Sequence, residues 1–322
     1  MAAFALACAI APVQIVQAQE AQDIAGALSA MQQRDQTLLD IGWKLASANA
    51  RYCDSTVPEI GLMVLDTGSF RDPPAIAAAL GVSGNILVQA AAQGSPAQAA
   101  GLASPMPITA IDGEPTAVPA AARPYGWEHL AATNERIAAS LARDGVVELR
   151  VEHESGNSST ARTALIEGAP ACEMRIEQRD GEDRARADGK RVLIGSNFAG
   201  FSYPQEELAA AVAHEMAHVV LGHSAWLDEA GRKRGNIRLT EREADRLSPW
   251  LLANAGYDPF AMERFMRRWG PDHSGGLLRK RTHDGWDERA TSIAAEAALV
   301  ARIHIEAGAA DWKAQFRREV AP

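Results

Sequence analysis

The 322-residue chain is short of cysteine and of positive charge, and it has no second long hydrophobic run. Three cysteines allow one disulfide at most. Lys and Arg number 32 against 41 Asp and Glu, giving a net charge of −9 with no basic cluster, so we expect no nucleic-acid partner. Beyond the N-terminus no segment approaches membrane-spanning length, which leaves at most a peripheral membrane contact. What remains is ordinary globular composition, 47% hydrophobic and 23% charged, in a chain longer than one typical domain.

The most informative segment is His214-Glu215-Met216-Ala217-His218. On a helix, residues four apart lie about 40° from each other around the axis, so both imidazoles leave one face and offer two nitrogen ligands to one zinc ion. Glu215 lies about 100° further round, where it can take a proton from the attacking water and deliver it to a leaving amine. Residues 205–213 and 219–221 are rich in Ala, Leu and Val, which predicts a buried helix. The alternative, a core helix with two surface histidines, fits poorly because apolar residues lie on every side.

A third ligand is expected from the segment 239–247. There Thr240 can cap a second helix, and Glu241 and Asp245 share one face of it at i,i+4 spacing. We predict that Glu241 binds zinc and that Asp245 orients a ligand imidazole through its second ring nitrogen. The alternative is an ordinary charged helix face.

Two further polar residues near these ligands point elsewhere on helical geometry. His223 follows His218 by five residues, a rotation of about 140°, so we predict a helix-end residue or one that orients a ligand from behind. Glu243 lies about 200° from Glu241 and is expected in solvent or paired with an arginine.

HEMAH, then EREAD, then Ala255-Gly256-Tyr257-Asp258-Pro259 resembles the HtpX, CAAX-prenyl-endopeptidase and BepA family of zinc metallopeptidases, from about Ala171 to the C-terminus. The resemblance implies a mostly helical gluzincin-type domain with one Zn²⁺ per chain. It implies that His214, His218 and Glu241 are the metal ligands, that Glu215 is the acid/base and that Asp245 supports a ligand.

The same resemblance includes Thr282-His283 followed by Arg289, and it adds His283 and Arg289 to the predicted catalytic residues. His283 would donate to a developing oxyanion or occupy the fourth metal position and hold the enzyme latent. Arg289 is expected chiefly as the partner of a carboxylate near the site. The chain departs from the family where Asp284 replaces the proline that usually follows this histidine.

The N-terminus predicts export. Residues 1–16 are apolar and lead to Val16-Gln17-Ala18, a small-residue cleavage site, so residues 1–18 are predicted to be a signal peptide and the protein to be periplasmic or secreted. The alternative is an amphipathic N-terminal helix. After cleavage Cys53 and Cys172 remain, and in an oxidising compartment we expect them to form a disulfide. The alternative is two buried thiols.

Residues 57–168 predict an independent β-rich module. SPAQAAGL at 95–102 and IDGEP at 111–115 resemble a bacterial PDZ domain, although Ser104-Pro105 replaces the Gly-Asp usual after AGL. Ile60-Gly61-Leu62-Met63 is the predicted peptide-binding strand, which would add the C-terminal tail of a client protein to the sheet edge. The alternative is a module that only packs against the protease.

Together these features predict an α+β protein in four parts: residues 1–18, an N-terminal helix in 19–56, a PDZ-like domain in 57–168 and a zinc metallopeptidase domain in 169–322. The predicted function is a zinc-dependent endopeptidase that hydrolyses exported or envelope proteins. One alternative is a chaperone-like scaffold that keeps the metallopeptidase fold and recruits clients through the module. A third is a zinc hydrolase of non-peptide substrates.

Overall fold

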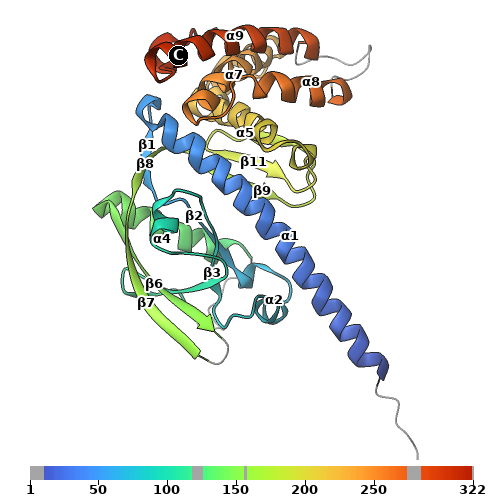
Figure 1. Cartoon of the computed structure of the whole chain (residues 1–322), viewed down its shortest axis with the longest axis vertical. Helices are drawn as coiled ribbons and strands as arrows, with labels where there is room; N and C mark the ends of the chain where they lie inside the picture. Colours follow the sequence, from blue (N-terminus) through green and yellow to red (C-terminus); the bar gives the residue numbers. More distant parts are fainter. Residues whose placement is uncertain (1–10, 118–125, 156–157, 274–283, 321–322) are drawn as a thin grey trace, which may run out of the picture. The chain divides into compact units, whose positions relative to one another are not determined.

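The computed structural model describes residues 11–117, 126–155, 158–273 and 284–320, and its fold is α+β (Figure 1). The chain divides into two compact units. Unit 1 comprises Leu62–Glu167 together with the chain up to Gln36, and unit 2 comprises Thr37–Gly61 with Gly168–Pro322. Within the described residues no helix is long and apolar enough to cross a membrane.

The first helix, α1 (Ala11–Asn49), contributes residues to both units. It starts eight residues before the segment 19–56 in which the helix is predicted, so residues 11–18 of the predicted signal peptide are helical, while residues 1–10 lie outside the described part. Its C-terminal portion buries Leu38, Ile41 and Leu45 completely in the core of unit 2. The i,i+3,i+4 spacing of these apolar residues gives that end of the helix one face to bury.

Unit 1 is built around one antiparallel sheet with the strand order β2-β3-β4-β6-β7, and β5 pairs with β4. Its strands are β2 (Leu62–Asp66), β3 (Ile86–Ala91), β4 (Met106–Ile111), β5 (Glu114–Pro115), β6 (Val146–Ser155) and β7 (Ser158–Glu167). Its helical segments are η2 (Thr67–Ser69), α2 (Pro73–Leu80), α3 (Pro96–Ala99) and α4 (Glu128–Asp144).

Helix α4 packs on this sheet, where it contacts β2 and β6. Ile137 and Leu141 are buried, and they lie four residues apart on the face that meets the strands. A buried polar contact joins the start of α4 to the end of β2, with His129 Nδ1 2.7 Å from Asp66 Oδ2. Because the partner of His129 comes from another element, the pair fixes the start of α4 against the end of β2.

The strand predicted to bind peptides begins two residues later than expected. Leu62 and Met63 lie in β2, which is an edge strand of the described sheet. Ile60 is 1% exposed and lies in the connection from β1 to β2. Gly61 has a φ of +65°, which interrupts the extended backbone before β2 and which glycine adopts without steric cost.

Unit 2 combines two small sheets with a group of helices. Its strands are β1 (Thr56–Glu59), β8 (Ala169–Cys172), β9 (Arg175–Arg179), β10 (Ala185–Ala187) and β11 (Arg191–Gly195). Its helical segments after α1 are η1 (Ala50–Tyr52), η4 (Ala199–Ser202), α5 (Gln205–Val220), α6 (His223–Ala230), α7 (Arg234–Asn254), α8 (Ala261–His273), α9 (Trp286–Ala307) and α10 (Trp312–Gln315).

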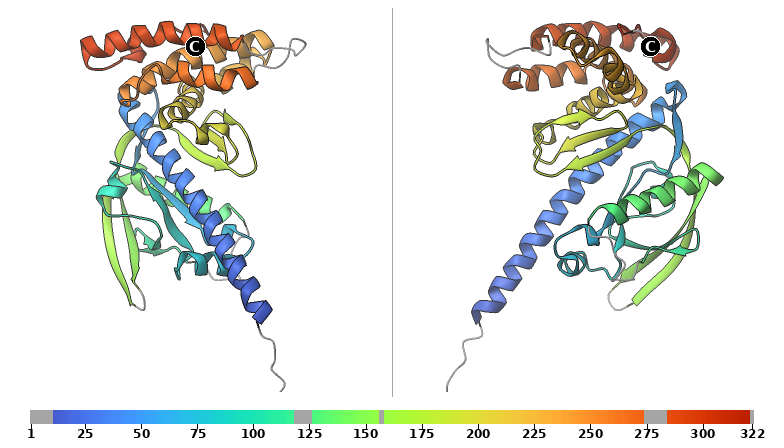
Figure 2. Two further views of the ribbon diagram at one scale, coloured as in Figure 1. Left: turned by 45° about the vertical axis from the view of Figure 1, so that its right-hand side comes forward. Right: turned by 180° about the vertical axis from the view of Figure 1, so that it is seen from behind.

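Helix α5 is the centre of unit 2. It packs against β10 and β11 of the sheet β10-β11-β9 and also against α7 and α8, and α9 in turn covers α7 and α8 (Figure 2). Ten of the 13 residues from Gln205 to Ala217 are buried, because Ala and Val side chains let neighbouring elements approach on several sides. The helix that carries the predicted metal ligands is therefore also the core of this unit.

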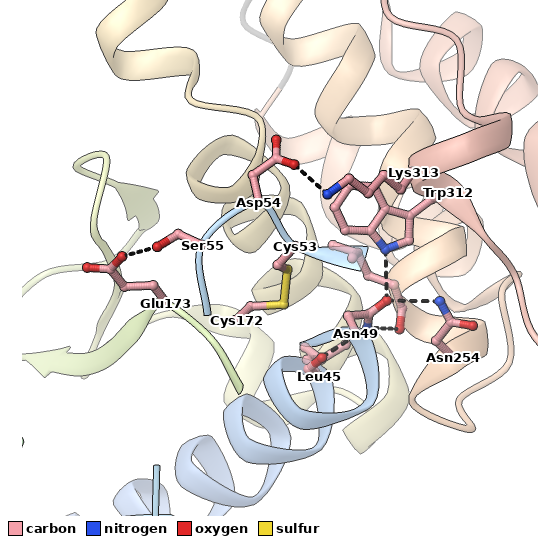
Figure 3. The surroundings of a disulfide bond; sticks show 11 residues. Leu45, Asn49, Cys53, Asp54, Ser55, Cys172, Glu173, Asn254, Trp312 and Lys313 are labelled. Carbon is pink, nitrogen blue, oxygen red and sulfur yellow. Dashed lines mark hydrogen bonds and ion pairs between the residues drawn. A yellow bond between two sulfur atoms is a disulfide. The ribbon is translucent and has the colours of Figure 1, made fainter. Parts of the chain in front are cut away.

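A disulfide joins the two chain segments that lead out of and back into unit 2. Cys53 and Cys172 are bonded across a sequence separation of 119, and β1 pairs antiparallel with β8 immediately beside them (Figure 3). Nearby, Asn49 is fully buried and its amide is saturated. It donates to Leu45 O and Leu251 O, and it accepts from Asn254 Nδ2 and Trp312 Nε1 (Figure 3). These bonds tie the end of α1 to distant parts of the chain without leaving a buried polar group unpaired.

Candidate metal centre

Helix α5 presents His214 and His218 from one face, as the four-residue spacing predicts. Its N-terminal turn carries Glu206 and Glu207, whose negative charges interact favourably with the positive end of the helix dipole. Glu207 is 3% exposed, and Arg268 of α8 donates to both its carboxylate oxygens. The buried carboxylate is thus neutralised, and the start of the helix is fixed to α8.

Three ligand atoms converge between α5 and α7. His214 Nε2 lies 3.3 Å from His218 Nε2; Glu241 Oε2 lies 3.4 Å from the first nitrogen, and Glu241 Oε1 lies 3.6 Å from the second. These residues form the only group of three or more metal-type side chains in the described part of the chain that could hold an ion. Ligand atoms about 2.0–2.1 Å from a tetrahedral zinc ion lie roughly 3.3–3.4 Å from one another. The observed separations therefore fit a tetrahedral cation.

Asp245 and Arg289 lie behind His214. Asp245 Oδ1 is 3.1 Å from His214 Nδ1, and Arg289 donates to both oxygens of Asp245 at 2.6 and 2.7 Å. Burial favours the neutral form of Asp245, but Arg289 and His214 outweigh it and lower the pKa of this carboxyl. Because Nδ1 faces this carboxylate, Nε2 is the atom that His214 offers to a metal. Asp245 therefore lies where the sequence analysis expects it, and Arg289 contacts a carboxylate beside the site.

The pKa values of the two histidines are shifted in opposite directions. Burial lowers the pKa of His214, but the contacts with Asp245 and Glu241 outweigh it and raise the pKa to about 10. Burial lowers the pKa of His218 to about 3. A cation bound by both rings would replace the proton that His214 holds, because a metal ligand must offer a free lone pair.

Glu215 is the carboxylate beside the three ligands. Burial raises its pKa to about 7, and the charge of His214 acts in the opposite direction. The backbone of Ala187 in strand β10 also acts to lower this pKa. A carboxyl group with a pKa near neutrality can both accept and release a proton at physiological pH, which is the property a general acid/base needs.

His223 contacts the candidate ligand His218. Helix α5 ends at Val220, Gly222 adopts a φ of +67°, and α6 starts at His223, so the chain turns before the rotation predicted for a continuous helix is complete. His223 Nδ1 lies 2.9 Å from His218 Nδ1, and its Nε2 lies 2.9 Å from Glu243 Oε2. The ring therefore approaches His218 from the side opposite the ligand nitrogen.

One expectation about α7 is wrong, and another is met only by its second alternative. Thr240 does not cap this helix, because α7 starts at Arg234 and Thr240 lies in its interior, donating to Ile237 O. Glu243 is not in solvent, because its side chain is 0% exposed; its predicted alternative, pairing with an arginine, is met by Arg318 at 3.0 Å. Burial raises the pKa of Glu243, but His223, the N–H of Val320 and Arg318 outweigh it and lower the pKa overall.

The sequence analysis did not identify Arg318 or the backbone of Glu319 and Val320 as neighbours of this site. Both N–H groups donate to Glu243 Oε1, across 76 and 77 residues of sequence. No spacing rule reaches that far. The available signal was Glu243 itself, a carboxylate that alternates with Glu241 and Asp245 along a helix buried on several sides.

His283, the predicted oxyanion donor or latent ligand, lies outside the described residues. Its neighbour Asp284 is described, and it pairs with Arg238 and Arg242 of α7. The residue that departs from the family pattern therefore connects the start of α9 to the helix that carries Glu241.

Comparison with known proteins adds no identification: no protein-family model and no curated sequence matches this chain. The family resemblance seen in the sequence therefore stays a prediction.

Proposed function

We propose that this protein is a zinc-dependent endopeptidase of the gluzincin type, with a PDZ-like module inserted before its catalytic domain. The observation that carries the proposal is the set of separations between His214 Nε2, His218 Nε2 and the Glu241 carboxylate, which fit one tetrahedral cation. Two imidazoles and one carboxylate are a typical catalytic zinc set, which leaves the fourth position open. A zinc ion bound there would polarise a carbonyl group and make a water molecule more acidic.

The residues around that position supply the rest of the chemistry. Glu215, with a pKa near 7, removes a proton from the attacking water and returns it to the amine that leaves. Asp245 and its partner Arg289 hold His214 in one orientation, so that the site keeps its geometry while charge moves through it. In this scheme Glu215 acts on the substrate, and Asp245 and Arg289 act through His214.

A peptide is the substrate class that the neighbouring strand favours. Strand β10 is an edge strand of the described sheet, because it pairs only with β11. Ala187 of that strand lies beside Glu215, and β10 contacts the helix that carries it. An extended peptide can add to a sheet edge through main-chain hydrogen bonds. Such pairing would place a peptide bond beside the carboxylate that cleaves it.

The inserted module and the compartment complete the proposal. The edge position of β2 is consistent with a PDZ-like strand that takes up client C-termini. The disulfide is typical of chains that fold in an oxidising compartment, which supports periplasmic or secreted clients.

The test is Glu215→Gln in the full-length, zinc-loaded protein. We expect the variant to bind one zinc per chain, as the wild type does, and to lose cleavage of a casein-type substrate by a factor of about 10²–10⁴ or more, because it lacks the general base. Glu206→Gln is the matched control, since Glu206 is on the same helix but pairs with Arg264 away from the ligands. Undiminished cleavage by Glu215→Gln would refute the mechanism. A chaperone-like protein would instead keep its client-protecting activity in this variant.

A further inference from the structure

A chain of buried side chains leads from His218 away from the candidate metal position. His218 Nδ1 contacts His223 Nδ1 at 2.9 Å, and His223 Nε2 contacts Glu243 Oε2 at 2.9 Å. His223 is 1% exposed and Glu243 is 0% exposed, so no solvent competes for these bonds. The contact between the two imidazoles uses Nδ1 of each ring, which leaves His218 Nε2 for the metal.

Glu243 is surrounded by hydrogen-bond donors. Its Oε2 accepts from Arg318 Nε at 3.0 Å in addition to the contact with His223. Its Oε1 accepts from the backbone N–H groups of Glu319 and Val320. Arg318 also donates to Leu221 O, at the turn between α5 and α6. The segment 318–320 therefore holds both the carboxylate and the turn that places His223.

The proton positions in this chain follow from the metal ligand. When His218 offers Nε2 to a cation, its single proton lies on Nδ1, and that N–H donates to His223 Nδ1. His223 must then carry its own proton on Nε2, from which it donates to Glu243 Oε2. The reverse arrangement would put a proton on His223 Nδ1 and set it against the proton on His218. Only one tautomer of each ring satisfies every contact.

We propose that His223 and Glu243 are positioning residues that select the metal-binding tautomer of His218, with the segment Arg318–Val320 as their anchor. The inference rests on the metal site of the proposed function and extends it to residues that touch neither metal nor substrate. Part of the metal affinity would then depend on the segment Arg318–Val320, whose Arg318 donates to Leu221 O across 97 residues of sequence.

Glu243→Gln tests the positioning role of Glu243 directly. The carboxamide must turn its NH₂ either toward His223 and Arg318 or toward the two backbone N–H groups, and both orientations set donor against donor. We expect zinc affinity, measured by competition with a chromophoric chelator, to fall by about 10- to 100-fold, as for other residues that support metal ligands. Substitution with Co²⁺ should show an altered visible spectrum, because the orientation of His218 changes.

Glu296→Gln is the matched control. Glu296 is also a largely buried carboxylate, and it pairs with Arg246 and Trp250 of the same helix α7 but contacts none of the ligands. We expect this variant to lose stability while keeping the wild-type zinc affinity. Equal zinc affinity in Glu243→Gln and the wild type would refute the positioning role of Glu243.

A measurement on the unmodified protein covers the case in which Glu243→Gln does not fold. Long-range ¹H–¹⁵N spectra of the zinc-loaded wild type should show His218 protonated on Nδ1 and His223 protonated on Nε2. A proton on His223 Nδ1 would refute the proposal that His223 selects the tautomer of His218, even if zinc binds tightly. Absence of zinc binding by the wild type is a different result, because it would refute the proposed metal site itself.

Discussion

Removal of the Cys53–Cys172 disulfide should destabilise unit 2, and the size of the loss depends on whether unit 1 stays folded. The bond closes a loop with a sequence separation of 119. If all of this loop is disordered in the unfolded state, the chain-entropy relation gives about 5 kcal/mol. If Leu62–Glu167 remains folded, only the segments 54–61 and 168–171 are free, and a loop of about a dozen residues gives about 3 kcal/mol.

The assay is chemical and thermal unfolding of the double variant Cys53→Ala/Cys172→Ala, compared with oxidised and reduced wild type. Both cysteines are buried, at 8% and 1% exposure, and alanine avoids placing a hydroxyl group there. A loss of about 3–5 kcal/mol in a unit of this size should lower Tm by on the order of 10 °C. Zinc affinity should not change, because neither sulfur belongs to the ligand set.

Two results would refute this reasoning. Two reactive thiols per chain in the denatured, unreduced protein would show that the bond is absent. An unchanged Tm after reduction would show that the bond closes a loop whose ends other contacts already hold.

Two further changes test the support of the site and the role of the module. Arg289→Met should cost about 3–5 kcal/mol of unfolding free energy in denaturant titration, because it leaves the buried Asp245 carboxylate without its cation; Arg267→Met, which breaks an exposed pair with Glu263, should cost less than about 1 kcal/mol, and equal losses would contradict the assignment. Deletion of Leu62–Glu167 joins Gly61 to Gly168 and leaves β1 and β8 as a hairpin with a three-residue loop, since Glu59 pairs with Ala169. We expect this variant to cleave short generic peptides at the wild-type rate and natural clients poorly; equal loss on both would make the module purely structural.

Local spacing predicted the features of the site that depend on a single helix. The common face of His214 and His218, and that of Glu241 and Asp245, follow from 3.6 residues per turn whatever the helix packs against. The predicted strand at residues 60–63 overlaps β2 at Leu62 and Met63, because Gly61 interrupts the extended backbone before them.

The features that the sequence did not predict depend on contacts between distant segments. The rotation per residue of a helix correctly predicts that Glu243 points away from Glu241. It does not predict what Glu243 contacts there, which is Arg318 and the backbone N–H groups of Glu319 and Val320 instead of solvent. The failed cap at Thr240 has a related cause: the helix extends back to Arg234, and Thr240 satisfies its hydroxyl group within the helix by donating to Ile237 O.

The β1–β8 pairing has a consequence for the order in which the protein folds. These strands lie next to each other in unit 2, yet all of Leu62–Glu167 separates them in sequence, so their pairing is a contact of very high sequence separation. Such contacts form slowly while the intervening chain is disordered. The intervening unit contains the long β6–β7 hairpin, whose pairing is local. We therefore expect Leu62–Glu167 to fold first during synthesis, and β1 to wait unpaired until β8 has been made.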